Sequence, residues 1–210
     1  MGKIDKIYQK IHASYFAFIG LVVFFVGLIP AMIVHPDFSF FVTHISYLGT
    51  PLNSLHIFFN VCWFITAIFI ILFLLGFTRY IQEKGINSKW AWIGCILGVL
   101  SAIGIMGMAI FNSDTVYIMH LTFELLFFMA GILYLFLYTY LEGKSSEFKN
   151  AQAIFNFIVV LFFLLYLVLL IMNRVNHGIA PEAESFTEWL FLFANLFWFF
   201  ENGVYMLKKK

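Results

Sequence analysis

The stretch THISYLGTPLNSLHIFFN, from Thr43 to Asn60, joins a polar loop to the start of a long apolar segment. Its first half combines Gly49 and Pro51 with several hydroxyl and amide side chains, a composition typical of turns. Pro51 cannot continue a helix, because it lacks a backbone N–H and clashes with the preceding turn. We therefore predict a structured loop followed by a helix whose N-cap is Asn53 or Ser54.

The segment after this loop, Val61–Phe77, is almost unbroken apolar sequence, and the chain contains five other segments like it. Of its 210 residues, 63% are hydrophobic and 11% are charged, which is far from the composition of a soluble domain. Each segment is close to or above the ~20 residues that a helix needs to cross a bilayer. Backbone groups in lipid must be hydrogen-bonded within the segment, which favours helices over open strands.

We therefore predict an all-α polytopic membrane protein, a bundle of six transmembrane helices. The whole chain, residues 1–210, is expected to form one membrane domain. The expected spans are about 15–34, 55–77, 90–111, 116–141, 153–172 and 186–206.

The basic residues predict how the chain is oriented. Eleven of the twelve Lys and Arg residues lie in the two termini and in the second and fourth loops, whereas Arg174 alone lies on the other side. Because basic loops stay in the cytoplasm, both termini are expected to be cytoplasmic and the first, third and fifth loops outside. The expected location is the cell membrane.

The composition also bounds the partners. No basic patch with interleaved aromatic residues occurs, so we expect no nucleic acid, and membrane lipid is the expected partner. Cys62 and Cys95 both lie inside apolar segments, where a free cysteine behaves as a small hydrophobic residue. The oligomeric state stays open.

Small residues recur along the segment 90–111 every three or four positions. Such spacing lets a neighbouring backbone approach closely, so this helix is expected at the packed centre of the bundle, with a dimerisation face as the alternative. The segment 153–172 is nearly featureless, with Tyr166 as the one polar side chain between Ile158 and Met172, and is expected to be peripheral and lipid-facing. The small residues are Gly94, Gly98, Ser101, Gly104 and Gly107.

A short pattern occurs twice, as HIFFNVCWF from His56 and as HLTFELLFF from His120. The spacing between the two copies, applied again to Glu124, leads to Glu188 in the last apolar segment. Three copies of a helical hairpin would produce this pattern, and so would coincidence in Phe-rich helices of similar length. In either case, the second, fourth and sixth helices carry polar residues at a similar depth.

Ionisable residues within a span are costly, so they are expected to face the bundle interior and to have partners. His120 and Glu124 are four residues apart, hence on one helix face and about 6 Å apart along the axis. A His and a carboxylate can act as an acid–base pair, a proton relay or metal ligands. The candidate catalytic residues are His56, His120 and Glu124. The candidate ligand-binding residues are His44, Ser46, Asn60, Asn112, Glu188 and Asn195.

From their shared depth, His56, Asn60, His120, Glu124 and Glu188 are expected to meet at one polar site. No cofactor is expected; a zinc ion, if one binds, would use His56, His120 and Glu124. Simpler roles stand beside these. An interfacial His can be merely solvated, and Glu124 can be a protonated acid bonded to Asn60. The seven-residue steps Glu188, Asn195 and Asn202 can line a path or join helices by hydrogen bonds.

Two groups of residues resemble a known family. HISYLG and the following IFFN, then GMAIFN and HLTFELLFF, resemble an uncharacterised prokaryotic six-span family, a domain of unknown function. The pattern, over about Phe38 to Leu141, is also similar to the eukaryotic group of damage-regulated autophagy modulators and a Golgi factor for lipid remodelling of glycosylphosphatidylinositol anchors. Tyr47 stands where the prokaryotic motif has Asp, so no role for that acid carries over. The resemblance implies a link to lipid.

These observations leave three functional hypotheses. The leading one is a protein that binds or handles a lipid or small amphiphile in a polar pocket open to the extracytoplasmic leaflet. The second is an intramembrane hydrolase or acyl-transfer enzyme that uses His56, His120 and Glu124, with or without a metal. The third is a small transporter that uses the polar face of the last helix.

Overall fold

Each long apolar run forms one helix, because a helix satisfies its own backbone hydrogen bonds. The computed structural model describes residues 7–208 except 9, 87, 146–147, 149, 176–177 and 179, and this part of the chain contains helices and no strand. Six of the helices are long and apolar enough to cross a membrane, as the sequence predicts. The elements are α2 (Ser14–Val34), the 3-10 helix η1 (Ile45–Gly49), α3 (His56–Glu83), α4 (Ser88–Ile110), α5 (Tyr117–Lys144), α6 (Asn150–Val175) and α7 (Pro181–Lys208).

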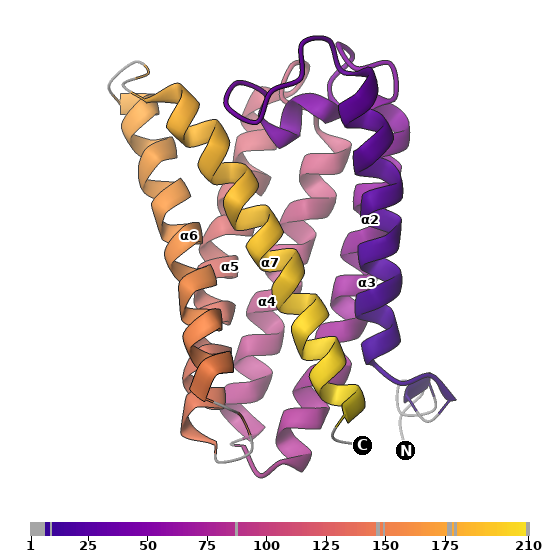
Figure 1. Ribbon diagram of the computed structural model, residues 1–210, viewed down its shortest axis with the longest axis vertical. Helices are drawn as coiled ribbons and strands as arrows, with labels where there is room; N and C mark the ends of the chain where they lie inside the picture. The colour runs from indigo at the N-terminus through magenta and orange to yellow at the C-terminus, as the bar shows by residue number, and fades with distance from the viewer. Residues whose placement is uncertain are drawn as a thin grey trace.

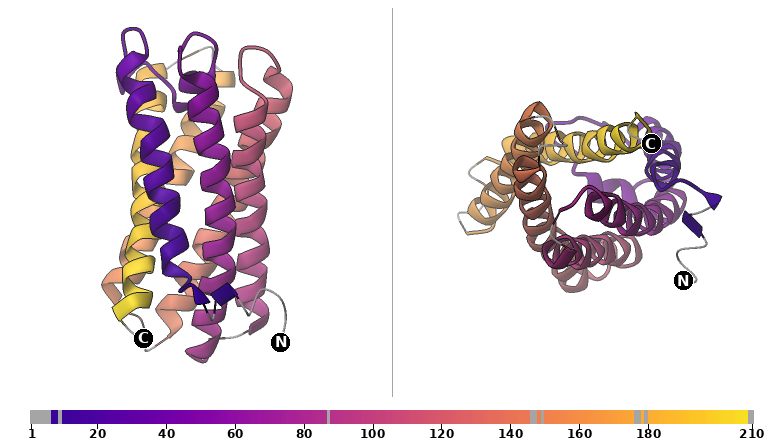
Figure 2. Two further views of the ribbon diagram at one scale, coloured as in Figure 1. Left: turned by 90° about the vertical axis from the view of Figure 1, so that its right-hand side faces the viewer. Right: turned by 90° about the horizontal axis from the view of Figure 1, so that it is seen from below.

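The helices pack in chain order around the bundle, and α7 closes it by packing against both α6 and α2 (Figures 1 and 2). The two termini lie at the same end, and η1 lies at the opposite end, which we call the η1 end. The interior is filled by aromatic side chains. Trp198 of α7, for example, is fully buried against Phe77 of α3 and Tyr138 of α5.

One helix end agrees with the sequence prediction and another does not. Helix α2 ends at Val34, as the expected span does, with Pro30 inside the helix and His35 extended before Pro36. The predicted N-cap of α3 is wrong, because Leu55 occupies that position and makes no side-chain cap. Asn53 is fully buried and instead braces the loop.

The brace made by Asn53 has two hydrogen bonds. Its Oδ1 accepts from the backbone N–H of Leu55 at 2.9 Å, and its Nδ2 donates to the carbonyl of Ala31 at 2.8 Å. The side chain therefore fixes the loop against the end of α2. An unpaired carbonyl at the buried Ala31 would cost more free energy than an uncapped N–H group in the first turn of α3, which borders the exposed loop.

The small residues of α4 let α5 approach closely, as expected for a packed centre. A Cβ on Gly104 would lie 2.6 Å from the backbone nitrogen of Phe127 and 2.8 Å from the carbonyl oxygen of Phe123. Ser101 adds a hydrogen bond to the carbonyl of Phe127 at 3.0 Å. The small-residue face is thus used within the chain.

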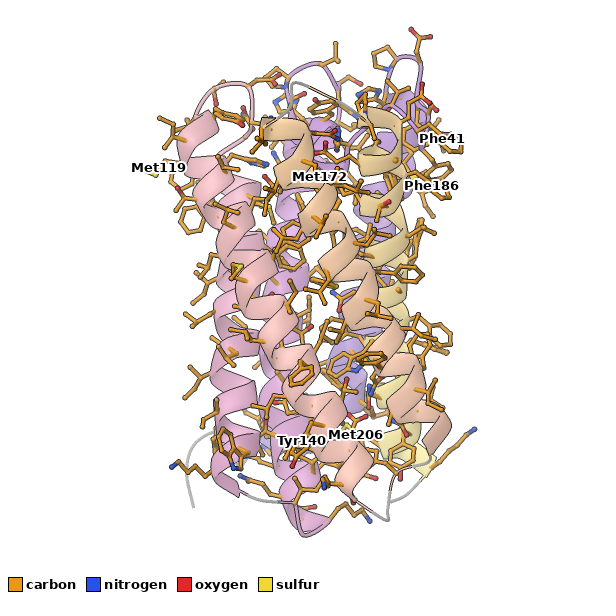
Figure 3. All side chains as sticks on the ribbon, turned by 90° about the vertical axis from the view of Figure 1, so that its left-hand side faces the viewer. Phe41, Met119, Tyr140, Met172, Phe186 and Met206 are labelled. Atoms are coloured by element: carbon orange, nitrogen blue, oxygen red, sulfur yellow. The ribbon has the colours of Figure 1, made fainter. Side chains whose placement is uncertain are left out.

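Helix α6 is peripheral, but it is not wholly lipid-facing. Ile158 and Leu161 are exposed, whereas Val159, Phe163 and Tyr166 are buried against neighbouring helices. Figure 3 shows carbon-rich side chains along the middle of the bundle's outer surface, with nitrogen and oxygen atoms gathered at its two ends. This distribution suits a bundle surrounded by lipid.

Candidate functional site

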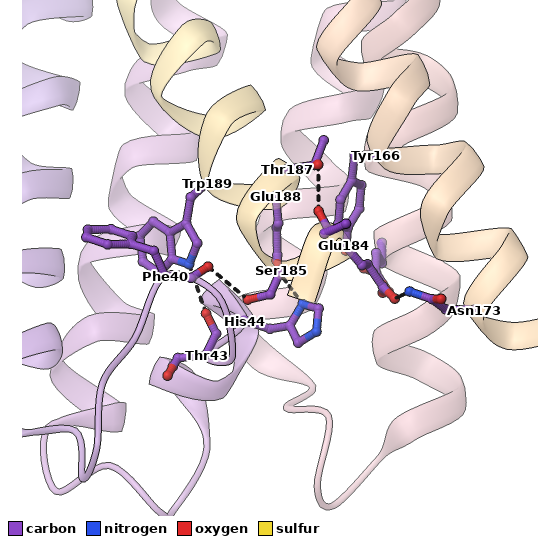
Figure 4. A network of polar contacts seen from close by, with 12 residues as sticks. Phe40, Thr43, His44, Tyr166, Asn173, Glu184, Ser185, Thr187, Glu188 and Trp189 are labelled. Atoms are coloured by element: carbon purple, nitrogen blue, oxygen red, sulfur yellow. Dashed lines mark hydrogen bonds and ion pairs between the residues drawn. The ribbon is translucent and has the colours of Figure 1, made fainter. Parts of the chain in front are cut away.

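A polar network at the η1 end ties the loop before η1 to the first turns of α7 (Figure 4). The indole Nε1 of Trp189 donates to the carbonyl of Thr43 at 2.8 Å, and the hydroxyl of Ser185 donates to the carbonyl of Phe40 at 3.3 Å. These bonds fix the loop by its backbone. They place His44 beside α7.

His44 and Glu188 form a close ion pair, with Nδ1 of the imidazole 2.6 Å from Oε2 of the carboxylate. Burial lowers the pKa of His44, but the charge and the hydrogen bond of Glu188 raise it more. The pKa of His44 is therefore above its ordinary value of 6.5, and the pair is favoured in its charged form.

Beside this network lies a polar cavity of about 350 Å³, which we call the vestibule and which His44 and Glu184 help to line. Its walls come from η1, the α4–α5 loop, the start of α5, the end of α6 and the start of α7. The polar lining residues used below are His44, Ser46, Asp114, His120, Glu124, Tyr166, Arg174 and Glu184.

A second, narrow space lies inside the bundle and shares three lining residues with the vestibule, and we call it the chamber. Its volume of about 30 Å³ is enough for roughly one water molecule. Its walls are mostly apolar and include Phe127, Phe128 and Phe191. Ser46, His120 and Glu124 line both spaces, so they lie at the boundary between polar and apolar surroundings, which we call the passage.

His120 and Glu124 hold defined positions at this passage. Nδ1 of His120 lies 2.7 Å from the carbonyl oxygen of Phe111, which can only accept, so Nδ1 carries the proton in this contact. Oε1 of Glu124 accepts a hydrogen bond from the hydroxyl of Tyr166 at 3.1 Å. The imidazole and the carboxyl thus face one cavity from successive turns of α5.

Of the five residues expected at one site, the structure brings together His120, Glu124 and Glu188, which all line the chamber. It does not bring His56 or Asn60 there. Nδ1 of His56 contacts the carbonyl of Asn53 at 2.8 Å in the first turn of α3. That end of α3 packs against η1 and α2, away from the cavity.

Asn60 binds the backbone of η1 instead of the expected polar site. Its Nδ2 donates to the carbonyl of Gly49 at 2.9 Å, and a Cβ on Gly49 would lie 2.4 Å from its Oδ1. Asn60 therefore holds η1 against α3, and a Cβ on Gly49 would force this amide to shift.

The remaining candidates are spread over the η1 end and the interior. Ser46 and His44 line the vestibule, and Asn195 lines the chamber. Asn112 accepts two hydrogen bonds from Thr115 at 2.9 Å and shapes the α4–α5 turn. His177, another polar residue of the fifth loop, lies outside the described residues.

The polar residues at seven-residue steps on α7 each bond to a different element. Glu188 pairs with His44, Asn195 accepts from Tyr134 of α5 at 3.3 Å, and Asn202 accepts from Gln152 of α6 at 3.1 Å. This arrangement favours the joining of helices over a continuous polar path.

This arrangement of side chains offers few ligands for a metal ion. Within the residues that the structure describes, no three His, Cys, Asp or Glu side chains are grouped as a metal site. His120 and Glu124 could supply two ligands, but His56 would not be their third.

Several vestibule residues are not among the candidates predicted from the sequence. Tyr166 is the one polar side chain between Ile158 and Met172, and Arg174 is the one basic residue expected on its side of the membrane, so the sequence contains a signal for both. Asp114 and Glu184 lie in short loops or at helix starts, where an acidic residue is common for reasons unrelated to a site. Their grouping depends on how the helices are turned about their axes.

The chain matches the family model described as the Frag1/DRAM/Sfk1/Cwh43P N-terminal domain over residues 11–201, from just before α2 to near the end of α7. No curated protein and no solved structure matches it. The family match supports the resemblance to the damage-regulated autophagy modulators. The resemblance to the prokaryotic family stays a prediction. With six apolar helices and a match over nearly its whole length, this chain is a membrane protein of the Frag1/DRAM/Sfk1 family.

Proposed function

We propose that the protein binds a lipid or another amphiphile, with the polar head of the ligand in the vestibule. The observation that carries this proposal is that a polar cavity and an apolar chamber are neighbours and share the lining residues Ser46, His120 and Glu124. A ligand that fits such a boundary has a polar head next to an apolar part.

The chamber is too small for an acyl chain as it stands. Its volume of about 30 Å³ is close to that of one water molecule, so a tail that enters it must displace aromatic side chains. The head of the ligand is therefore the part that we assign to a preformed space, and the vestibule of about 350 Å³ provides that space.

The basic residues support an orientation for this site. Arg79, Lys84 and Lys144 belong to the end of the bundle opposite η1, and Arg174 belongs to the η1 end. By the positive-inside rule, the termini are cytoplasmic and the vestibule opens toward the extracytoplasmic leaflet, in the cell membrane.

Blocking the passage tests the proposal. Ser46→Phe places a ring where the vestibule meets the chamber, whereas Ser54→Phe adds the same ring to an exposed loop position at the same end. We expect the parent protein and Ser54→Phe to retain a defined lipid through gentle extraction, and Ser46→Phe to lose it, by mass spectrometry. Equal lipid content in all three would exclude the vestibule as the binding site.

A second candidate is hydrolysis or acyl transfer on a lipid. The observation that favours it is the meeting of a hydroxyl, an imidazole and a carboxyl, those of Ser46, His120 and Glu124, around one passage. One measurement distinguishes an enzyme from a binding protein. An enzyme converts a lipid ester at a rate that His120→Gln abolishes, whereas a binding protein returns the lipid unchanged.

A further inference from the structure

Together with Glu188, the acidic groups at this site outnumber the basic ones. Among the described residues, the vestibule is lined by the acids Asp114, Glu124 and Glu184 and by the bases His44, His120 and Arg174. His44 is already paired with Glu188, a fourth acid, which borders the chamber. Even with all three bases charged, four carboxyl groups face three cations.

Two of these carboxyl groups are held by neutral donors. Glu184 accepts a hydrogen bond from the side-chain amide of Asn173, and Glu124 accepts one from the hydroxyl of Tyr166 at 3.1 Å. A neutral donor positions a carboxyl group but supplies no balancing positive charge, and a cation that enters beside the partly buried Glu124 would favour its ionised form. Attraction for a cation grows as water is excluded, so these groups favour a positively charged ligand over a negatively charged one.

The cations of the site already have partners. The guanidinium of Arg174 lies over the ring of Tyr117, 5.6 Å from its centroid, and its side chain is exposed. The ring of Tyr117 therefore already receives a cation at the rim of this cavity. The rings of Tyr47 and Tyr166 also line the vestibule and present further aromatic surface to a ligand.

We propose that the head of the bound amphiphile carries an ammonium group, held by the carboxyl groups of Glu124 and Glu184 and by the tyrosine rings of the vestibule. This inference rests on the proposed function and adds the chemical class of the head. A primary amine would donate hydrogen bonds to the carboxylates, and a quaternary ammonium would use charge and ring contacts.

The test is a competition among lysolipids that share one acyl chain and differ in the head. Lysophosphatidylethanolamine, lysophosphatidylcholine and lysophosphatidylglycerol are added in equal amounts to the full-length protein, and occupancy is read by native mass spectrometry. Free ethanolamine is added in a separate arm. We expect each of the two ammonium lipids to exceed the glycerol lipid by about tenfold, the effect of one charge-assisted hydrogen bond for the primary amine and of one cation–π contact for the quaternary ammonium.

Matched variants assign that preference to the vestibule. Glu184→Gln keeps an acceptor for Asn173 but removes the charge, so it should reduce the preference for ammonium. Glu182→Gln removes an exposed charge two residues earlier and should leave the preference unchanged. Asp114→Asn, on an exposed loop, repeats the test without touching the packing of α6 and α7.

The outcomes separate the two proposals. Equal binding of all three lysolipids, or a preference for the glycerol head, overturns the ammonium assignment and leaves the amphiphile site standing. Absence of binding by any lysolipid overturns both. Displacement of the lipids by an equal concentration of free ethanolamine supports recognition of ammonium but overturns the need for an amphiphile.

Discussion

At the scale of single residues, depth along a helix was predictable and direction around it was not. His120, Glu124 and Glu188 were expected at a common depth, and the structure groups them around the chamber. His56 and Asn60 share that depth but face other neighbours. Helices that are apolar on nearly all sides carry little periodic signal, so the sequence does not indicate which face points inward.

The ion pair of His44 and Glu188 predicts a pH-dependent stability. Because the pKa of His44 is raised in the folded protein, the contribution is complete below about pH 6.5 and is lost as the pH rises through the folded pKa. The two side chains are 17% and 9% exposed, so we expect His44→Gln to lower the free energy of unfolding by roughly 1.5–3 kcal/mol at the lower pH. Thermal unfolding in detergent at several pH values measures this.

The same measurement on Glu188→Gln provides the control for this pair. Both variants should approach the parent protein in stability as the pH rises, because the parent loses the charged pair there. A stability difference that stays constant, or that grows with pH, would show that the pair is not what stabilises this junction.

At the scale of helices, the small residues of α4 predicted its packing better than the apolar composition of α6 predicted the packing of that helix. Gly104 and Ser101 recur at helical spacing, and close packing against α5 follows from that spacing. In α6, the apolar composition suggested a peripheral, lipid-facing helix, yet Val159 and Phe163 are fully buried. A buried helix face and a lipid-facing one can have the same composition, because both surroundings are apolar.

Two glycines of α4 predict unequal costs for the same change. A Cβ on Gly104 meets backbone atoms of α5, whereas a Cβ on Gly98 lies 2.6 Å from Cδ1 of Leu74, the end of a flexible side chain. We expect Gly104→Ala to destabilise the protein by about 1–3 kcal/mol, and Gly98→Ala by clearly less. The amount of folded protein after heating in detergent compares the two.

A surface change on α6 serves as the reference for that comparison. Leu161 is 47% exposed, so Leu161→Ala should leave the folded fraction close to that of the parent. Equal losses for Gly104→Ala and Gly98→Ala would mean that α4 and α5 are not held at the distance described above.

At the scale of the whole molecule, the six-helix bundle was predictable because length and hydropathy suffice to identify spans. The closure of the bundle by α7 was not, because it depends on contacts between residues far apart in the chain. The vestibule belongs to this level, since its walls come from loops and helix ends that meet only when the bundle closes.

The orientation in the membrane is a prediction at this scale. In intact cells, an impermeant thiol reagent should label Ser54→Cys and Thr115→Cys, which are exposed at the η1 end. It should label Gly143→Cys, exposed at the opposite end, only after the membrane is opened. The reverse pattern would place the vestibule on the cytoplasmic side.

The binding of an amphiphile head in the vestibule is tested most directly by photo-crosslinking in the membrane. A lipid with a photoactivatable group on its head is incorporated, and the modified residues are identified by mass spectrometry. The account predicts adducts on vestibule residues such as Ser46, Tyr47 and Tyr117. Adducts confined to lipid-facing residues such as Phe136 and Leu161, with none in the vestibule, would contradict it.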